Sequence, residues 1–158
     1  MTPFENLSSA CRRSAGFTLI ELMTTVLIAG ILLSVATPYF SDFILGQRIR
    51  TAASDLASSL VYARSEAVKR NTGVTVAPAT GGWQNGWTVT VGAAVLGSHE
   101  AFTGLTLTGP VGGLVYNSSG RLAAVPTPFS ISASGSSAVP RCVSVDLSGL
   151  PGNATGSC

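Results

Sequence analysis

The chain has 158 residues, of which 46% are hydrophobic and only 10% are charged, and its formal net charge is +2. This length holds one modest domain, and a charge so close to neutral gives no overall sign of nucleic-acid binding. Beyond residue 71 the charges cancel, because Arg121 and Arg141 are balanced by Glu100 and Asp146. We therefore expect no basic surface of the kind that follows a phosphate backbone in the C-terminal half.

Residues 17–37 form an apolar run with a single charged residue, Glu21. As a helix at ~1.5 Å per residue, this run extends about 31 Å, which is the thickness of one hydrocarbon core. Arg12 and Arg13 precede it, so the positive-inside rule predicts a cytoplasmic N-terminus and export of everything that follows. The alternative is a conventional secretory signal, for which the small residues around Ala36 offer a weak cleavage site.

Glu21 argues against that alternative. A carboxylate inside a membrane span costs on the order of a few kcal/mol, so it normally has a partner. A cut between Gly16 and Phe17 would create an α-amino cation at the start of the same helix. This cation could neutralise the carboxylate within one chain or on a neighbouring chain. The remaining possibility is that Glu21 lies at headgroup depth and has no partner.

The stretch GFTLIEL, which starts at Gly16, resembles the class III signal of type IV pilins and type II secretion pseudopilins. The resemblance implies that a prepilin peptidase removes residues 1–16 as a leader and that Phe17 becomes the N-methylated mature N-terminus. It also implies that Glu21 pairs with the N-terminal amine of an adjacent subunit in a filament.

Two further residues of this segment match helix-weakening positions of many pilins, Gly30 and Pro38. The family pattern implies that the helix melts locally there during assembly. Independently of the family, Pro38 lacks the amide that an α-helical hydrogen bond needs, so a kink or a looser turn is expected.

Residues 38–72 continue the helical pattern but become amphipathic. The apolar positions recur at spacings of three and four, which predicts one face buried against a globular head. They are Ala53, Leu56, Ala57, Leu60, Ala63 and Ala67. The sequence Asn71-Thr72-Gly73 predicts the end of the helix. We expect Arg64, Lys69 and Arg70 to form a solvated face with local ion pairs to Glu66.

Residues 73–158 have the texture of short strands separated by turns rich in Gly, Pro, Ser and Asn. The expected strands are residues 74–77, 87–91, 101–108, 114–117, 129–133 and 142–147. The fold expected is therefore α+β, in which a long N-terminal helix packs on a C-terminal antiparallel sheet.

The sequence also resembles the GspH/FimT family, which holds H-type pseudopilins and the FimU and FimT minor pilins. The matching stretches are ARSEAVKRN at 63–71, VTV at 74–76, Trp83 and GWTV at 86–89, with looser matches GRL at 120–122, FSI at 129–131, RCVSV at 141–145 and Ser148-Gly149. We expect Trp83 and Trp87 to be sheet-packing residues whose indole groups find nearby acceptors.

One departure from this family bears on DNA binding. DNA-binding FimT proteins are associated with a basic Gly-Arg-x-Arg motif near the C-terminus, and the corresponding place here reads SGLPG at 148–152. Leucine and proline supply no charge, which argues against a DNA-uptake receptor. Arg121 and Arg141 remain as weak candidates for phosphate contacts.

Processing would remove Cys11 with the leader and leave Cys142 and Cys158 in an exported domain. We expect a disulfide between them, and the alternatives are free thiols or intermolecular pairing. Two cysteines and His99 do not make a metal-ligand set, and we expect His99 to be a surface residue. No catalytic motif is present, so neither a cofactor nor an enzymatic activity is expected.

These features predict a structural subunit that is held in the inner membrane with its head in the periplasm and then enters a filament. Its expected partners are the prepilin peptidase, other minor pilins or pseudopilins, and the major subunit. The first hypothesis is a minor pilin of a type IV pilus and the second is the H pseudopilin of a type II secretion system, with a priming role near the filament tip. A DNA-uptake pilin and a plain signal-anchored periplasmic domain are the alternatives.

Overall fold

The computed structural model describes residues 16–158, except for the side chains of residues 35–39. The chain divides into two compact units, one that ends at Thr37 and one that runs from Pro38 to Cys158. The helix α1 (Leu19–Arg70) contributes to both. Each unit is described by itself. The expected leader, including Cys11, Arg12 and Arg13, lies outside the described residues.

Local sequence explains both ends of α1. At the start, the Glu21 amide donates to the Thr18 hydroxyl oxygen at 3.3 Å, so Thr18 acts as an N-cap. At the end, Asn71 adopts the left-handed conformation with a φ of 51°. The Thr72 amide then donates to the Ala67 carbonyl at 3.2 Å, and the Asn71 amide to the Val68 carbonyl at 3.2 Å. This pair of bonds is a Schellman motif, and it ends the helix where the Asn-Thr-Gly sequence predicts.

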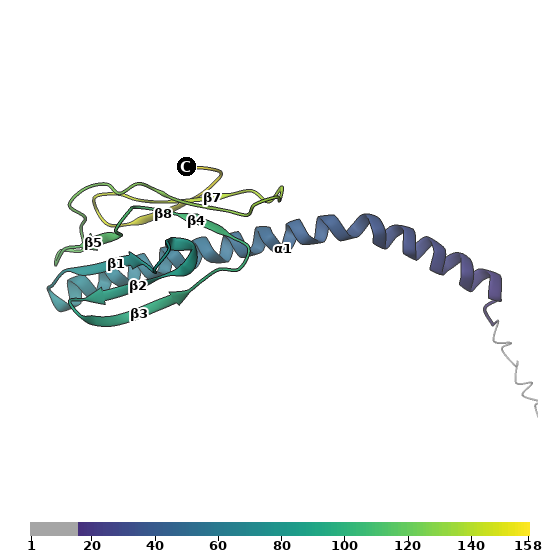
Figure 1. Cartoon of the computed structure of the whole chain (residues 1–158), viewed down its shortest axis with the longest axis horizontal. Coiled ribbons are helices and arrows are strands. Elements are labelled where there is room, and N and C mark those ends of the chain that lie inside the picture. Colours follow the sequence, from purple (N-terminus) through teal and green to yellow (C-terminus); the bar gives the residue numbers. More distant parts are fainter. Residues whose placement is uncertain (1–15) are drawn as a thin grey trace, which may run out of the picture. The chain divides into compact units, whose positions relative to one another are not determined.

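The unit from Pro38 onward contains two antiparallel four-stranded sheets (Figure 1). The first has the order β3-β2-β1-β5 and the second has the order β4-β6-β7-β8. The strands are β1 (Val74–Pro78), β2 (Gly86–Val91), β3 (Ala94–Glu100), β4 (Thr106–Thr108), β5 (Leu114–Tyr116), β6 (Phe129–Ser132), β7 (Arg141–Val145) and β8 (Pro151–Thr155), with a short 3-10 helix η1 at Trp83–Asn85.

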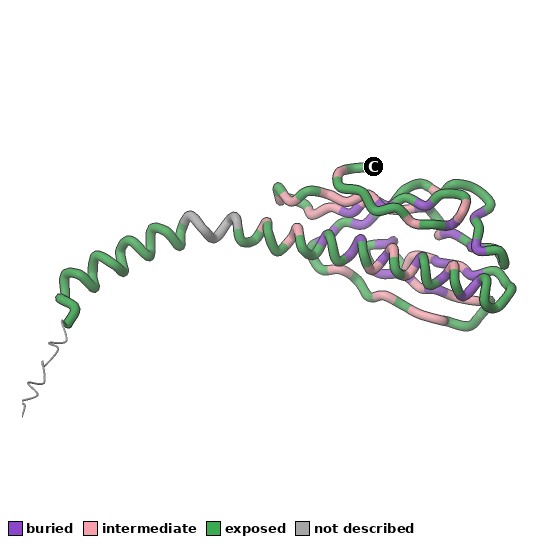
Figure 2. The backbone as a smooth tube through the Cα atoms, turned by 180° about the vertical axis from the view of Figure 1, so that it is seen from behind, coloured by how far each residue is buried: buried purple, intermediate pink, exposed green. Residues whose placement is uncertain are grey.

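Both sheets pack on the C-terminal part of α1 and share one hydrophobic core with it (Figure 2). The helix contributes Ile49, Ala52, Ala53, Leu56, Leu60, Ala63 and Ala67, all fully buried. Four of these are alanines, which let the strands approach the helix closely. The sheets contribute alternate residues, such as Val74 and Val76 in β1 and Phe129 and Ile131 in β6. This alternation is the period of a half-buried strand.

The head is antiparallel, as expected, and its strands form two sheets. Two details of the strands differ from expectation. The strand expected at 101–108 is only β4, because Thr103 and Gly104 form a turn before Thr106. The strands β3 and β8 were not expected, since AVLGSHE and PGNAT are exposed edge strands without a buried alternating stripe.

Candidate assembly and processing site

The expected cleavage point lies in a short non-helical segment just before α1. Residues 16–18 have no regular secondary structure, and helix begins at Leu19. A Cβ placed on Gly16 would meet no atom within 4 Å, and Phe17 is 78% exposed. The peptide bond between them therefore lies in an exposed, non-helical stretch.

Glu21 lies in the first turn of α1 and is exposed. A carboxylate near a helix N-terminus is favoured by the helix dipole, and Thr18 and Glu21 have the spacing of a capping box. Within the residues that the structure describes, the Glu21 carboxylate has no ion-pair partner. Its charge is therefore available to a cation supplied by a neighbouring molecule or by a new N-terminus at Phe17.

The helix is continuous through both positions expected to weaken it. Gly30 is helical, and a Cβ there would meet nothing within 4 Å. The backbone at Pro38 is also helical, but its side chain lies outside the described side chains. Local melting at these positions stays a prediction.

Large apolar side chains surround the N-terminal part of α1 and are all exposed. They are Leu19, Ile20, Leu22, Met23, Val26, Leu27, Ile28, Ile31, Leu32 and Leu33, between 55% and 77% exposed. Because they point in every direction around the axis, this segment has no polar face. A helix that is apolar all round is normally covered by lipid or by other helices.

The expected membrane span, residues 17–37, ends in residues 35–37, whose side chains are not described. Among the described residues, a search for a helix long and apolar enough to cross a membrane finds none.

In the head, several residues of the GspH/FimT pattern hold the fold together. The Arg64 Nε donates to the Gly120 carbonyl at 3.1 Å, which joins α1 to the turn after β5. A Cβ on Gly149 would lie 2.3 Å from the Gly120 carbonyl oxygen and 2.8 Å from the Tyr116 ring. With a φ of 80°, Gly149 is therefore fixed by both backbone conformation and space. The residues Arg64, Gly120 and Gly149, which match the family pattern, therefore stabilise the fold of the head.

The two tryptophans are core residues, as expected. Trp83 is 4% exposed, and its indole N–H donates to the Pro110 carbonyl at 3.0 Å. Trp87 is 1% exposed and stacks on the His99 ring with centroids 4.4 Å apart. His99 stacks in turn on Phe102 at 4.6 Å.

His99, which was expected at the surface, is partly exposed and also makes contacts inside the head. Its side chain is 29% exposed, and its Nε2 lies 3.4 Å from the Asp55 carboxylate on α1. It joins the edge strand β3 to the helix. Sequence could not reveal this role, because Asp55 and His99 are 44 residues apart.

Glu66 also departs from expectation. The Arg70 Nε donates to one carboxylate oxygen at 2.6 Å, and Lys69 Nζ donates to the other at 3.4 Å. The ion pairs were expected, but Glu66 is buried with 6% exposure, while Arg64 bonds a carbonyl instead. The hydrogen bond from Arg70 lowers the pKa of Glu66 despite the opposing effect of burial, with Lys69 adding to the decrease.

The stretch SGLPG, where the DNA-binding FimT motif would lie, comprises the end of the turn between β7 and β8 and the first two residues of β8. The Asp146 carboxylate accepts from the Ser148 hydroxyl at 2.5 Å and from the Leu150 amide at 3.3 Å. The Ser148 bond lowers the pKa of Asp146 more than burial raises it. The turn is thus closed by a carboxylate and carries no cationic side chain.

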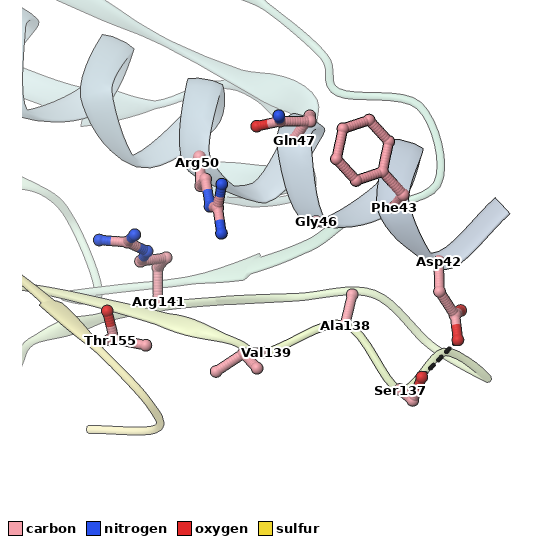
Figure 3. Close-up of a pocket in the computed structure, with 10 residues that line it drawn as sticks. All are labelled: Asp42, Phe43, Gly46, Gln47, Arg50, Ser137, Ala138, Val139, Arg141 and Thr155. Carbon is pink, nitrogen blue, oxygen red and sulfur yellow. Dashed lines mark hydrogen bonds between the residues drawn. The ribbon is translucent and has the colours of Figure 1, made fainter. Parts of the chain in front are cut away.

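The two weak candidates for phosphate contacts are in different surroundings. Arg121 is exposed after the turn at Asn117, and its amide donates to the Asn117 side-chain oxygen at 3.0 Å. Arg141 starts β7 and lines a cavity of about 290 Å³ that also contains Arg50 of α1 (Figure 3). The structure gives the two candidates no common contact. Arg141 instead shares a cavity with Arg50, which the sequence did not single out.

The structure contains the expected disulfide between Cys142 and Cys158, with a Cα–Cα distance of 5.1 Å. Cys142 lies in β7, and β8 pairs with β7 from Val145↔Pro151 to Arg141↔Thr155. The disulfide therefore fixes the chain just beyond an ordered strand. Together β7 and β8 form a β-hairpin.

Comparison with known proteins agrees with this architecture. The family model of the type II transport protein GspH matches residues 52–149, and the model of the prokaryotic N-terminal methylation motif matches residues 11–37. A search of the curated proteins gives no significant match.

Two crystal structures of the type IV minor pilin FimU from Pseudomonas aeruginosa (strain PAO1) are similar to the chain, each with a TM-score of 0.59. One is 28% identical, and the match covers 66% of this chain and 91% of that one. The other is 27% identical, with 73% and 91% covered. The pilin fold, a long helix on antiparallel sheet, is thus the fold of this protein, and proteins of this family and fold are structural rather than enzymatic. Because the GspH model covers more than half of the sequence, the chain belongs to the GspH family of type IV pilin-like proteins, with a prokaryotic N-terminal methylation motif at its start.

Proposed function

We propose that the chain is a minor subunit of a type IV pilus, made as an inner-membrane precursor and built into the filament near its tip. One observation carries the proposal: the processing motif leads directly into a helical segment that exposes apolar side chains on every side. Lipid before assembly and neighbouring helices after it would bury them.

In this mechanism the prepilin peptidase cuts between Gly16 and Phe17 and the new N-terminus is methylated. The peptide bond's accessible, non-helical surroundings support the cut. Glu21 then attracts the N-terminal amine of an adjacent subunit, which sets the register of the entering helix. The head makes lateral contacts with other minor subunits and primes assembly.

The processing step is tested by mass spectrometry of the mature protein purified from membranes. The proposal predicts an N-terminus at Phe17 that carries one added methyl group. An intact chain, or an N-terminus beyond Ala36, would show that the segment is a plain anchor or a discarded signal.

The assembly step is tested by Glu21→Gln in the full chain. This variant keeps the side-chain shape and the Thr18 cap, since the capping bond goes to the Glu21 amide. We expect normal cleavage after Gly16 and a loss of at least tenfold in the amount of subunit found in sheared filaments. Glu100→Gln, which removes the same charge from the exposed edge strand β3, is the matched control and should enter filaments normally. Equal entry of both variants would contradict the role of Glu21.

The second candidate is an H-type pseudopilin of a type II secretion system, and the description of the matching family model favours it. The similarity to the minor pilin FimU supports the pilus instead. Deletion of the gene separates the two. Lost twitching motility with normal release of secreted proteins supports the pilus, and the opposite pair of results supports secretion.

A further inference from the structure

A small cavity with two arginines lies between α1 and the second sheet of the head; we call it the Arg50–Arg141 groove. Its volume is about 290 Å³. One wall is the helix from Asp42 to Arg50, and the opposite wall is the β6–β7 loop at residues 137–139 together with Arg141 and Thr155. Figure 3 shows both arginine side chains entering the space between the helix and the strand. All these residues belong to the unit from Pro38 onward.

The β6–β7 loop is fastened to the helix by Asp42. Its carboxylate accepts a hydrogen bond from the Ser136 hydroxyl at 2.8 Å and another from the Ser137 hydroxyl. These bonds, led by that from Ser137, lower the pKa of Asp42. Ser136 also accepts the Ala138 amide at 3.0 Å. The wall of the groove is therefore built by specific contacts, and the one acid lining the groove is engaged with serines rather than with the arginines.

The two guanidinium groups lack a carboxylate partner. Arg141 Nη1 donates to the neutral side-chain oxygen of Asn153 at 3.3 Å. The Arg50 side chain has neither a hydrogen bond nor an ion pair with any residue that the structure describes. Two cations that border the same small space repel each other, and an anion placed between them removes that repulsion. Arginine is also the side chain best suited to bind a carboxylate through two parallel hydrogen bonds.

The remaining lining distinguishes between classes of anion. Phe43, 58% exposed, and Val139, also 58% exposed, offer apolar surface beside the arginines. A strand of nucleic acid needs a continuous basic track, whereas residues 72–158 carry no net charge and Asp42 would repel a polyanion. The volume lies just below the roughly 300 to 1,000 Å³ of pockets for drug-sized ligands, which suits one side chain. A single carboxylate beside an apolar group fits this lining, because the carboxylate can meet the arginines and the apolar group can meet Phe43 and Val139.

We propose that the Arg50–Arg141 groove is a subunit contact site that binds an acidic side chain, flanked by an apolar one, from a neighbouring filament subunit. This inference rests on the proposed function, because a filament is what supplies the neighbour. The groove would give the head a defined lateral contact, with Arg50 and Arg141 holding the carboxylate and Phe43 and Val139 covering its apolar neighbour.

The test is a calorimetric titration of the full mature chain in zwitterionic detergent with a capped hexapeptide of alternating leucine and glutamate. The same peptide with glutamine in place of glutamate is the control, and it measures how much peptide enters the detergent micelles without binding the protein. We expect the glutamate peptide alone to bind, and Arg50→Gln and Arg141→Gln each to weaken binding at least tenfold. Arg121→Gln is the matched control, since it removes an exposed arginine away from the groove, and it should leave the affinity unchanged.

Three results would overturn the inference: no binding of the glutamate peptide, equal binding of the glutamine peptide, or binding that survives both groove variants. Tighter, arginine-dependent binding of a 20-base-pair DNA duplex would assign the groove to phosphate instead. Urea unfolding of each variant confirms that the fold is intact. If the peptide fails to bind while Phe17 is the methylated N-terminus and the chain enters filaments, only this inference fails. An unprocessed N-terminus removes the proposed function whatever the titration shows.

Discussion

Two stretches of the same helix use apolar residues in opposite ways. Between Leu19 and Leu33 every large apolar side chain is more than half exposed, whereas Ile49, Leu56 and Leu60 are completely buried. The second stretch is covered by two sheets from its own chain, whereas the side chains of the first stretch are exposed. Both stretches therefore form helix, but only in the second are the apolar side chains buried by residues of the same chain.

The glutamates of the two stretches differ in the same way. Glu66 is buried and receives hydrogen bonds from Lys69 and Arg70 on its own helix. Glu21 is exposed and has no ion-pair partner among the described residues. The head thus supplies electrostatic partners for Glu66, whereas the described residues supply none for Glu21. Four measurements test this contrast.

The largest effect is expected from truncating one leucine in each stretch. Leu56→Ala removes a completely buried side chain and should lower the free energy of unfolding of the head by about 2–5 kcal/mol. Leu27→Ala, where the side chain is 64% exposed, should change it by less than about 0.5 kcal/mol. Urea unfolding in detergent measures both, because the only two tryptophans, Trp83 and Trp87, lie in the head. A comparable loss in Leu27→Ala would mean that the N-terminal stretch supports the head.

Removal of the disulfide tests how far the head sustains itself. Cys142 and Cys158 are 16 residues apart, so the cross-link is worth roughly 3 kcal/mol in the chain-entropy model. The double variant with serine at both positions should lose about that much in urea unfolding. Reduction of the unchanged protein should have the same effect, and reduction of the double variant should have none. A much smaller loss would show that the β7–β8 hairpin persists in the unfolded chain and restrains it without the disulfide.

A pair of glycines separates backbone conformation from packing in the head. Gly149→Ala introduces a Cβ at a φ of 80° and against the Gly120 carbonyl, and should cost about 1–3 kcal/mol. Gly104→Ala has a similar φ of 76° but no atom within 4 Å of the new Cβ, so it should cost only about 1 kcal/mol. Equal losses in the free energy of unfolding would show that the turn moves to accommodate the methyl group.

Sequence predicts those features that depend on neighbours along the chain. The end of α1 follows from Asn71, and the strands β1, β2, β5, β6 and β7 follow from runs of β-branched and aromatic residues bounded by turns. The disulfide follows from cysteine number and compartment. The edge strands β3 and β8 escape this reasoning, because they are stabilised by hydrogen bonds to a neighbouring strand rather than by their own side chains.

The groove and the histidine stack were beyond sequence because they join distant residues. Asp42 and Ser136 are 94 residues apart, and nothing near either of them indicates the contact. Arg50 reads as one more charge on an amphipathic helix until Arg141 is placed beside the same cavity. Motifs could find the processing segment, where the chemistry is contiguous. They could not find the Arg50–Arg141 groove, because two separate elements supply its residues.

The smallest effect is expected in the response to acid, and it compares the two glutamates directly. Hydrogen bonding to Arg70 holds the pKa of Glu66 below its ordinary value of 4.5. A carboxyl whose pKa is lower in the folded state stabilises the fold above the ordinary pKa and loses that contribution as pH falls through the folded value. Glu66→Gln should therefore reduce stability at pH 7 and make the decline below pH 4.5 shallower. The stability of Glu66→Gln should still decrease in acid, because the pKa values of Asp42 and Asp146 are lowered as well.

Glu21→Gln is the control for this acid response, measured by urea unfolding of the full chain in detergent from pH 7 to pH 3. Glu21 has no partner among the described residues, so its variant should follow the unchanged protein at every pH. If Glu21→Gln instead flattens the acid decline as Glu66→Gln does, the carboxylate already has a cationic partner within the isolated subunit. The attraction to an adjacent subunit would then have to compete with that internal pair, and the contrast between the two stretches of helix would no longer hold for their charges.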